Sequence, residues 1–493
     1  MFKKIKFKQK QALIILLIIL CSGALLRGYQ LDQESLWTDE MVTLTHLRQG
    51  SYQEIISSVE AYELMPAGYF LLLSPLVKLF GDREFALRAF SALFDSVAII
   101  LVYLLGARFF GRKAGLVSAL WYATLMSAIV YAQEARPYSL FGLLALSSTY
   151  LLVLWHEKDQ YRSEKGKFIF LGVSYIIVGA ISLYINYMAL FLLLLQFLLT
   201  LFFQQKLFLK RFLKKQLLAF GAIILLFIPG IPTLWTQVII RQVSLQNNLV
   251  LRGVPSFLSN LGIGFYLLPI CTTIVGLAAV LFILRKQDQN KKNRDFLAGR
   301  KGILALTALI LALLLQIIFL QTTLRSFALI RHSFFIIPFL IIVVAGGLLK
   351  LRRKIAVVVI LLVVIFNLTA IAIYYQETTK TPWKEAVSLI ESHLSGYPVV
   401  LFDRGGSNLG LYDYYQQRTT VIIDLTKDQN GPVGEVSRSE LAQKVAGYDQ
   451  FWFISSRNFQ GKVSYQELLE KNNRKLQEYS FPEMKVIQFS KGK

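Results

Sequence analysis

The sequence is poor in charged residues for its size. Only 17% of its 493 residues are Asp, Glu, Lys or Arg, whereas soluble proteins contain about 25%. Hydrophobic residues make up 55%, and the mean hydropathy is +0.51. A soluble domain could not bury that much apolar surface, but a lipid bilayer can cover it. The composition therefore excludes an ordinary soluble protein and predicts an integral membrane protein.

Cysteine and histidine are also scarce. The two cysteines, Cys21 and Cys271, both fall inside apolar runs, which excludes a disulfide framework. The four histidines do not combine with cysteine at the spacing of a metal site, and His46 stands alone. We assign no cofactor and no metal-binding residue, and we leave a divalent metal ion open.

Acidic residues are the rarer of the two charged classes. Asp and Glu number 30 against 53 Lys and Arg, which gives a formal net charge of +23. The basic residues gather between apolar runs, as in cytoplasmic loops that face anionic lipid, so no nucleic-acid partner is expected. The clusters are Arg108/Arg112/Lys113, Lys158/Arg162/Lys165/Lys167, Lys206/Lys210/Arg211/Lys214/Lys215, Arg285 to Lys301, and Lys350/Arg352/Arg353/Lys354.

The apolar runs predict about eleven membrane-spanning helices of roughly 20 residues each. Their ranges are 11–28, 86–107, 114–131, 136–155, 168–185, 187–204, 216–234, 260–284, 302–321, 330–349 and 355–374. The shorter run Pro66 to Phe80 is expected to be re-entrant or interfacial, because a further crossing would place every basic cluster outside. We therefore expect a multi-pass protein of the inner (plasma) membrane whose N-terminus is cytoplasmic.

Three regions then lie outside the cell: the first outer loop (29–85), the second outer loop (131–138) and the chain after the last span. We expect a transmembrane domain over 1–376 and a separate extracytoplasmic domain over 382–493. In the latter, short β-type runs alternate with helix-like stretches, which predicts a small α/β fold. The β-type runs are Val399 to Phe402, Thr420 to Ile423, Phe451 to Ile454 and Val486 to Phe489, and the helix-like stretches are Trp383 to His393, Ser439 to Ala446 and Tyr465 to Leu476.

The first outer loop contains two adjacent carboxylates, Asp39 and Glu40, shortly after Trp37. The tryptophan suits a membrane interface. Two interpretations are open for the carboxylates: they serve chemistry, or they are solvated and cap a helix through Thr38 or Asp39.

The second outer loop contains Gln133, Glu134, Arg136 and Tyr138 between two apolar helices. Polar groups at membrane depth are costly, so this cluster is a candidate site. The alternative is an ion pair between Glu134 and Arg136 at a helix end, with Pro137 in the first turn of the next helix.

Other polar residues stand near predicted membrane boundaries. Arg325 and Arg331, the latter followed by His332, suit binding of a lipid phosphate, or else they anchor to headgroups. Asn186 is a candidate residue at the rim of a site. Asp95 lies in mid-membrane, and we expect it to pair with Arg88 in a structural role.

These segments together resemble the GT-C glycosyltransferases, in particular the protein O-mannosyltransferase and lipid A aminoarabinose transferase group. The resemblance is dense over about 30–155. It rests on Leu36-Trp37-Thr38-Asp39-Glu40, Pro66-Ala67-Gly68-Tyr69, the run from Phe80 to Arg88, the run from Phe110 to Gly115, and Tyr131 through Tyr138. The chain departs from many relatives at Met65-Pro66-Ala67, where they have His-Pro-Pro, and at Asn186, where they have His.

The resemblance implies a transfer of sugar from a polyprenyl-phosphate carrier to a lipid, glycan or protein acceptor at the outer face. Asp39 would be the general base or positioning carboxylate, and Glu40 and Glu134 complete the expected catalytic set. Arg136 and Arg331 would hold the carrier phosphate. The remaining expected substrate contacts are Trp37, Tyr69, Tyr138, Asn186, Arg325 and His332. In-line attack predicts inversion at the anomeric carbon, and Asp39, Glu134 and Arg331 should face one hollow.

Two other functions compete with this one. A transporter or flippase of a lipid-linked precursor would usually have two related halves, and no such repeat is evident. A membrane scaffold whose outer domain binds cell-wall polymer would depend on 382–493 and would leave the membrane site idle.

Overall fold

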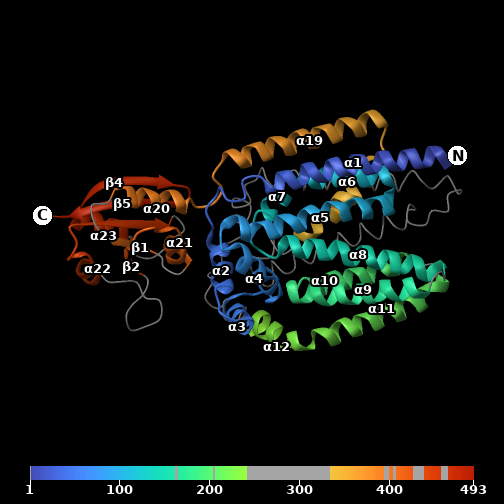
Figure 1. Ribbon diagram of the computed structural model, residues 1–493, viewed down its shortest axis with the longest axis horizontal. Helices are drawn as coiled ribbons and strands as arrows, with labels where there is room; N and C mark the ends of the chain where they lie inside the picture. Colours follow the sequence, from blue (N-terminus) through green and yellow to red (C-terminus); the bar gives the residue numbers. More distant parts are fainter. Residues whose placement is uncertain are drawn as a thin grey trace. The chain divides into compact units, whose positions relative to one another are not determined.

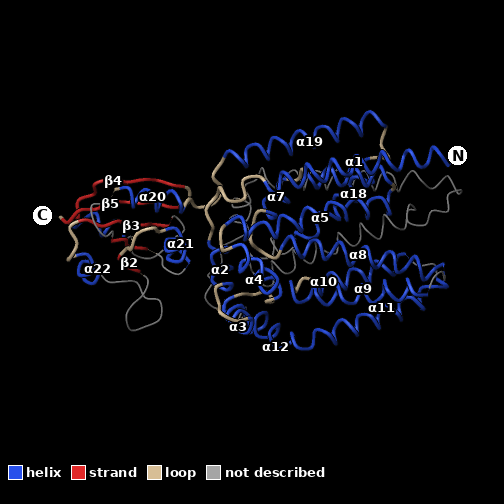
Figure 2. Tube along the Cα trace, viewed as in Figure 1, coloured by secondary structure: helices blue, strands red, loops and turns tan. Residues whose placement is uncertain are grey.

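The computed structural model describes residues 2–161, 165–203, 206–240, 334–393, 399–403, 407–425, 438–456 and 465–492. These residues form two compact units. The membrane unit comprises Met1–Tyr29 and His46–Ile371, and the C-terminal unit comprises Gln30–Thr45 and Ala372–Lys493. Figure 2 shows that the described part of the membrane unit is helical, whereas every strand belongs to the C-terminal unit.

Six of the described helical segments are long and apolar enough to cross a bilayer, and a bent pair could form a seventh span. The long helices contact one another in a series (Figure 1): α1 contacts α5, α5 contacts α8, α8 contacts α9, and α9 contacts α11. The chain is therefore a multi-pass membrane protein, as its composition predicted. The six segments are α1 (Phe2–Gly28), α5 (Glu84–Phe110), α8 (Tyr138–Tyr161), α9 (Lys165–Ile185), Phe212–Gln237, which begins in α11 (Lys206–Phe227), and α19 (Arg353–Gln376).

The predicted span 114–131 is broken rather than continuous. It forms α6 (Arg112–Ala123) and α7 (Met126–Ala132), which meet at an angle of 60°. At the break, the hydroxyl of Thr124 donates to the backbone oxygen of Leu120 and accepts from the side-chain amide of Asn367 at 3.4 Å. Mean hydropathy does not register such a bend, because the apolar run continues across it.

The predicted number of eleven spans stays a prediction. Two of them, 260–284 and 302–321, lie outside the described residues. Two others are described in part: α10 (Ala189–Phe203), and η5 (Phe334–Ile336) continuing into α18 (Ile337–Leu348). After α11 the chain forms the short turns η1 (Ile228–Gly230), α12 (Ile231–Leu234) and η2 (Trp235–Ile240).

The first outer loop is itself helical, with α2 (Thr38–Leu47), α3 (Tyr52–Tyr62) and α4 (Gly68–Phe80). Helix α4 has 13 residues, so it is about 20 Å long and too short to cross about 30 Å of hydrocarbon. Gly81 and Gly111 follow α4 and α5 with φ angles of 82° and 90°. Only glycine adopts this conformation at little cost, which explains the Phe-Gly pairs that recur before α5 and α6.

The C-terminal unit contains a five-stranded sheet of order β2-β1-β3-β5-β4. Strand β1 pairs in parallel with β2 and β3, whereas β5 pairs antiparallel with β3 and β4. The elements are α20 (Trp383–Ser392), β1 (Val399–Phe402), α21 (Ser407–Tyr415), β2 (Val421–Asp424), α22 (Arg438–Val445), β3 (Gln450–Ser456), α23 (Tyr465–Asn472), β4 (Asn473–Phe481) and β5 (Met484–Lys491).

Helices cover both faces of this sheet. On one face, Leu441 of α22 and Leu469 of α23 join Leu401, Phe453 and other strand residues in the hydrophobic core. On the other face, Trp383 of α20 stacks on Phe402, and Tyr412 of α21 contacts the same ring edge-on. The alternation of side chains along β1 therefore supplies both layers, and the expected α/β domain is confirmed.

Candidate functional site

The acidic segment of the first outer loop lies at the N-terminus of α2. Asp39 and Glu40 are the second and third residues of that helix, where its dipole favours negative charge. Asp39 is half-buried, and its backbone oxygen accepts the hydroxyl of Thr43 at 3.1 Å. Its carboxylate thus sits on the first turn of a helix rather than in an irregular loop.

Glu40 is fully buried beside Asp39. Its Oε2 accepts the backbone N–H of Trp37 at 3.4 Å and lies 3.2 Å from Nζ of Lys380. The bond to Trp37 is one half of a helix-capping arrangement. Glu40 thus takes part in capping the helix, whereas Asp39 beside it is half-buried.

The second outer loop carries Arg136 into an ion pair that sequence reasoning did not foresee. Its Nη1 and Nη2 atoms bond to Oε1 and Oε2 of Glu63 at 2.6 and 3.2 Å, and both residues are buried. Glu63, which directly follows α3, is therefore a charge partner of the Arg136 guanidinium. The backbone N–H of Arg136 also donates to the backbone oxygen of Glu134 at 2.8 Å.

His46 adds a further buried polar group to this pair. Its Nε2 lies 3.9 Å from Oε1 of Glu63, its Nδ1 lies 2.8 Å from the hydroxyl of Ser58, and its ring meets Phe70 edge-on. Burial lowers the pKa of His46, Glu63 raises it and Arg136 lowers it. No sequence motif marked Glu63 or His46, because the contacts that define them are made only in the folded chain.

Tyr69 and Tyr138 pack around the same turn. The hydroxyl of Tyr69 lies 3.2 Å from that of Ser91, which in turn donates to the backbone oxygen of Arg136 at 3.3 Å. The ring of Tyr138 packs edge-on against Tyr131, with centroids 5.4 Å apart. Tyr69, Glu134, Arg136 and Tyr138 thus belong to one region of the membrane unit.

Asn186 lies between α9 and α10 and is buried. Its side-chain oxygen accepts the backbone N–H of Met188 at 2.9 Å, a local turn of the kind that starts a helix. The neighbouring Tyr187 donates to Oε1 of Gln237 at 2.6 Å.

The structure divides the expected site residues between the two units. Trp37, Asp39 and Glu40 belong to the C-terminal unit, whereas Tyr69, Glu134, Arg136, Tyr138 and Asn186 belong to the membrane unit. Arg325, Arg331 and His332 lie outside the described residues. Within the described ranges, no three His, Cys, Asp or Glu side chains come together in a way that could hold a metal ion.

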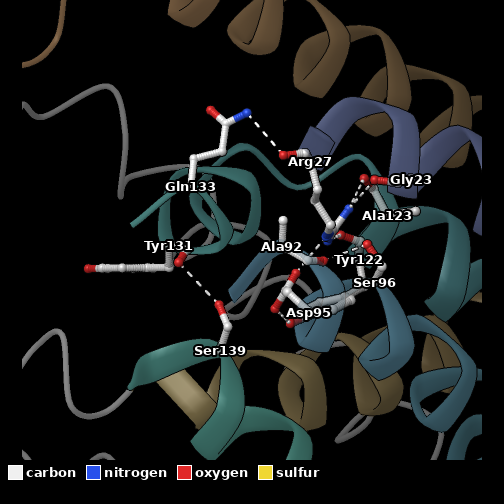
Figure 3. Close-up of polar contacts among 10 residues, drawn as sticks. All are labelled: Gly23, Arg27, Ala92, Asp95, Ser96, Tyr122, Ala123, Tyr131, Gln133 and Ser139. Carbon is white, nitrogen blue, oxygen red and sulfur yellow. Dashed lines mark hydrogen bonds and ion pairs between the residues drawn. The ribbon is translucent and has the colours of Figure 1, made fainter. Parts of the chain in front are cut away.

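The buried carboxylate of Asp95 pairs with Arg27 of α1 (Figure 3), so the expected pairing with Arg88 is corrected. Nε of Arg27 donates to Oδ2 of Asp95 at 2.6 Å, and the hydroxyl of Tyr122 donates to Oδ1 at 2.5 Å. The remaining guanidinium nitrogens bond to the backbone oxygens of Gly23, Ala123 and Tyr122. This network joins α1, α5 and α6, and its structural role is the one expected for Asp95.

The same helices hold the second outer loop. The side-chain amide of Gln133 donates to the backbone oxygens of Arg27 and Tyr29 at 3.2 and 2.7 Å. The hydroxyl of Ser139 donates to the backbone oxygen of Tyr131 at 3.1 Å. Figure 3 shows the contacts of Gln133 with Arg27 and of Ser139 with Tyr131, together with the Arg27–Asp95 pair. The turn before α8 is thereby fixed to the end of α1.

Comparison with known proteins finds one matching family model. The family described as dolichyl-phosphate-mannose-protein mannosyltransferase matches residues 65–235. No curated protein matches the sequence.

Solved structures match over nearly the whole chain. ArnT from Cupriavidus metallidurans in the apo state has a TM-score of 0.62 at 12% identity, with 98% of each chain covered. The same protein bound to undecaprenyl phosphate has a TM-score of 0.58 at 13% identity, with 96% of this chain and 97% of that chain covered. The Archaeoglobus fulgidus oligosaccharyltransferase, in a complex with Zn and sulfate, has a TM-score of 0.51 at 14% identity and covers 97% and 73%. These matches confirm the predicted fold class.

Proposed function

We propose that this chain, which has the fold of the GT-C glycosyltransferases, transfers a sugar from a polyprenyl-phosphate donor to an acceptor at the extracytoplasmic face. The observation that carries the proposal is the likeness to ArnT over 98% of both chains, together with the ArnT structure that holds undecaprenyl phosphate. The matching family model, whose description names dolichyl-phosphate-mannose, supports the same class of donor.

In the proposed reaction, Asp39 accepts the proton of the acceptor hydroxyl as that oxygen attacks the anomeric carbon. The bond between the anomeric carbon and the phosphate oxygen breaks, and the polyprenyl phosphate leaves with the electron pair. Attack from the opposite face inverts the configuration. The position of Asp39 in the first turn of α2 supports this role, because a general base must be held within reach of the proton that it accepts.

The leaving phosphate needs positive charge. Arg136 supplies a guanidinium that is always charged and that Glu63 holds in a fixed orientation. We propose that Arg136 faces the phosphate together with Arg331 and Arg325, with His332 beside them. Tyr69, Tyr138, Asn186 and Trp37 are proposed to contact the sugar, the carrier or the acceptor, and Glu134 to position the acceptor.

The proposed topology follows from the basic clusters. The N-terminus and the basic loops face the cytoplasm, and the C-terminal unit faces outward from the inner (plasma) membrane. The donor is then reached from the outer leaflet, and the acceptor is an envelope lipid, glycan or protein.

The test is transfer of labelled sugar in proteoliposomes. Undecaprenyl-phosphate mannose and undecaprenyl-phosphate glucose serve as donor probes, with extracted envelope as acceptor. We expect Asp39→Asn to lower turnover by about 10²- to 10⁴-fold, the usual contribution of a general base. Asp32→Asn makes the same charge change in the same segment, at an exposed residue, and should leave turnover unchanged.

Three outcomes would count against the proposal. Equal turnover in the wild type and Asp39→Asn would remove Asp39 from the mechanism. Absence of transfer from both donors would contradict the donor class. Movement of labelled lipid across the bilayer without a new glycosidic bond would favour the transporter alternative.

A further inference from the structure

The segment that carries Asp39 is built into the C-terminal unit. Residues 30–45 cluster with 372–493 rather than with the helices that flank them in sequence. Between Leu31 and Leu44, six apolar or hydroxyl side chains and one carboxylate are buried, namely Leu31, Ser35, Leu36, Glu40, Met41, Thr43 and Leu44. The segment is therefore packed as part of a folded domain.

One end of this segment is held by the chain that follows α19. The carboxylate of Glu34 accepts the backbone N–H and the hydroxyl of Thr379 at 2.5 and 2.9 Å, and the backbone N–H of Lys380 at 3.3 Å. Lys384 adds two bonds, from its backbone N–H to the hydroxyl of Ser35 and from Nζ to the backbone oxygen of Asp32.

The middle of the segment rests on α21. The hydroxyl of Tyr415 accepts the backbone N–H of Leu36 at 2.7 Å. Met41 lies against Gly410, where an added Cβ would stand 3.0 Å from its Cε atom. Helix α21 is in turn packed on the sheet through Tyr412 and Phe402, so the position of the segment depends on the domain core.

Lys380 contacts Glu40, the residue that follows Asp39 in the chain. Its Nζ lies 3.2 Å from the fully buried carboxylate of Glu40, and its own side chain is only 10% exposed. An ionised carboxylate is costly to bury unless a counter-charge and hydrogen bonds compensate. Lys380 provides that counter-charge, and Glu40 also accepts the N–H of Trp37, which fixes the helical turn on which Asp39 stands.

We propose that Lys380 is a positioning residue for Asp39, acting through Glu40, and that the C-terminal unit is part of the catalytic machinery. The inference rests on the proposed function, because it takes Asp39 as the general base of the proposed transfer reaction. It specifies what the outer domain does: it holds the first turn of α2 at a fixed orientation. Binding of the acceptor or shielding of the site would not require the contact between Lys380 and Glu40.

The first test measures transfer kinetics with the full-length chain in proteoliposomes and the undecaprenyl-phosphate donor probes. Lys380→Met should lower kcat roughly 10- to 100-fold, since misplacing a reacting group by about 1 Å has an effect of this size, and should leave the donor KM within about twofold. Lys380→Arg keeps the charge and should restore most of the lost kcat. Lys444→Met is the matched control, because Lys444 pairs with Glu440 on α22, and it should behave as wild type.

A second variant distinguishes a loss of positioning from a simple loss of folding. Lys380→Met alone removes the positive charge that Lys380 places beside the buried Glu40, whereas Glu40→Gln with Lys380→Met removes both charges of this contact and reduces that penalty. The double variant should therefore fold, yet still show the low kcat because the link between the two residues is lost. A wild-type kcat in Lys380→Met, or in the double variant, would overturn the proposal.

The last measurement does not depend on transfer. A spin label is placed at Asp39→Cys in a background with Cys21→Ser and Cys271→Ser, and its mobility is read by electron paramagnetic resonance. Lys380→Met should increase the mobility of the label, and Lys380→Arg should not. Increased mobility without transfer in the wild type would reject the proposed function and keep the positioning role; unchanged mobility in Lys380→Met would reject the positioning role alone.

Discussion

The guanidinium of Arg136 lies against the carboxylate of Glu63, with two nitrogen–oxygen contacts of 2.6 and 3.2 Å. Glu63 directly follows α3 in the first outer loop, and Arg136 precedes α8, so the pair joins two residues that are 73 positions apart in the sequence. Both side chains are buried, where bidentate hydrogen bonds between charged groups are strong. Removing one partner of the pair would therefore destabilise the fold. The pair orients the guanidinium of Arg136, which we propose faces the donor phosphate.

Glu63→Ala should therefore destabilise the chain strongly. Removing one partner of a buried ion pair leaves the other uncompensated and typically costs about 3–5 kcal/mol. Arg136→Lys keeps the charge but cannot form the two parallel bonds, so it should reduce the free energy of unfolding less than Glu63→Ala does. Thermal unfolding in detergent measures both. Arg48→Lys is the control, because Arg48 pairs with Asp82 at the surface, and it should change the unfolding temperature little. Equal shifts for Glu63→Ala and Arg48→Lys would contradict the interpretation.

The Arg27–Asp95 pair should behave as a coupled unit inside the bundle. Both side chains are at most 1% exposed, and the pair links α1 to α5. Asp95→Ala should cost about 3–5 kcal/mol, whereas Arg27→Met with Asp95→Ala should cost less than the sum of the single variants. A double-mutant cycle of unfolding in SDS gives the coupling. Strict additivity would mean that the contact contributes nothing of its own.

Gly68 lies where the backbones of two segments approach closely, and no larger side chain fits between them. A Cβ there would stand 2.4 Å from the backbone oxygen of Tyr184 on α9. Backbone cannot move aside as a flexible side chain does, so Gly68→Ala should destabilise by about 1–3 kcal/mol through overpacking. At Gly142 in α8, an added Cβ meets no atom of the described residues within 4 Å. Gly142→Ala should therefore stabilise slightly, by about 0.4–1 kcal/mol. The unfolding temperatures of the two variants should shift in opposite directions from that of the wild type.

Regular elements could be predicted wherever hydropathy alone determines them. The spans at α1 and α9 and the strand Val399–Phe402 lie where the apolar runs placed them. Strand β4 was missed, because Asn473 to Phe481 is a mostly exposed edge strand rich in charged residues. Its first residues continued the helical stretch expected from Tyr465 to Leu476, which ends at Asn472 as α23.

Charge partners could not be predicted in the same way. A same-helix neighbour was the natural partner for Asp95, but the structure pairs it with Arg27, 68 residues away. Glu63 lacked a motif, and Lys380 stood in a linker between the last span and the outer domain. Such pairs depend on how the helices and loops pack together, and periodicity within one segment carries no information on that packing.

The pH dependence of stability should include a contribution from His46, which lies outside the spans. Burial, the largest effect, lowers the pKa of His46 below its ordinary value of 6.5. The unfolded chain then binds a proton at higher pH than the folded chain does, so the contribution of His46 is complete above about pH 6.5 and is lost as the pH falls below it. The unfolding temperature of the wild type should thus decrease between about pH 6.5 and 5 more steeply than that of His46→Gln. Parallel slopes for wild type and His46→Gln would show that protonation of His46 is not coupled to unfolding.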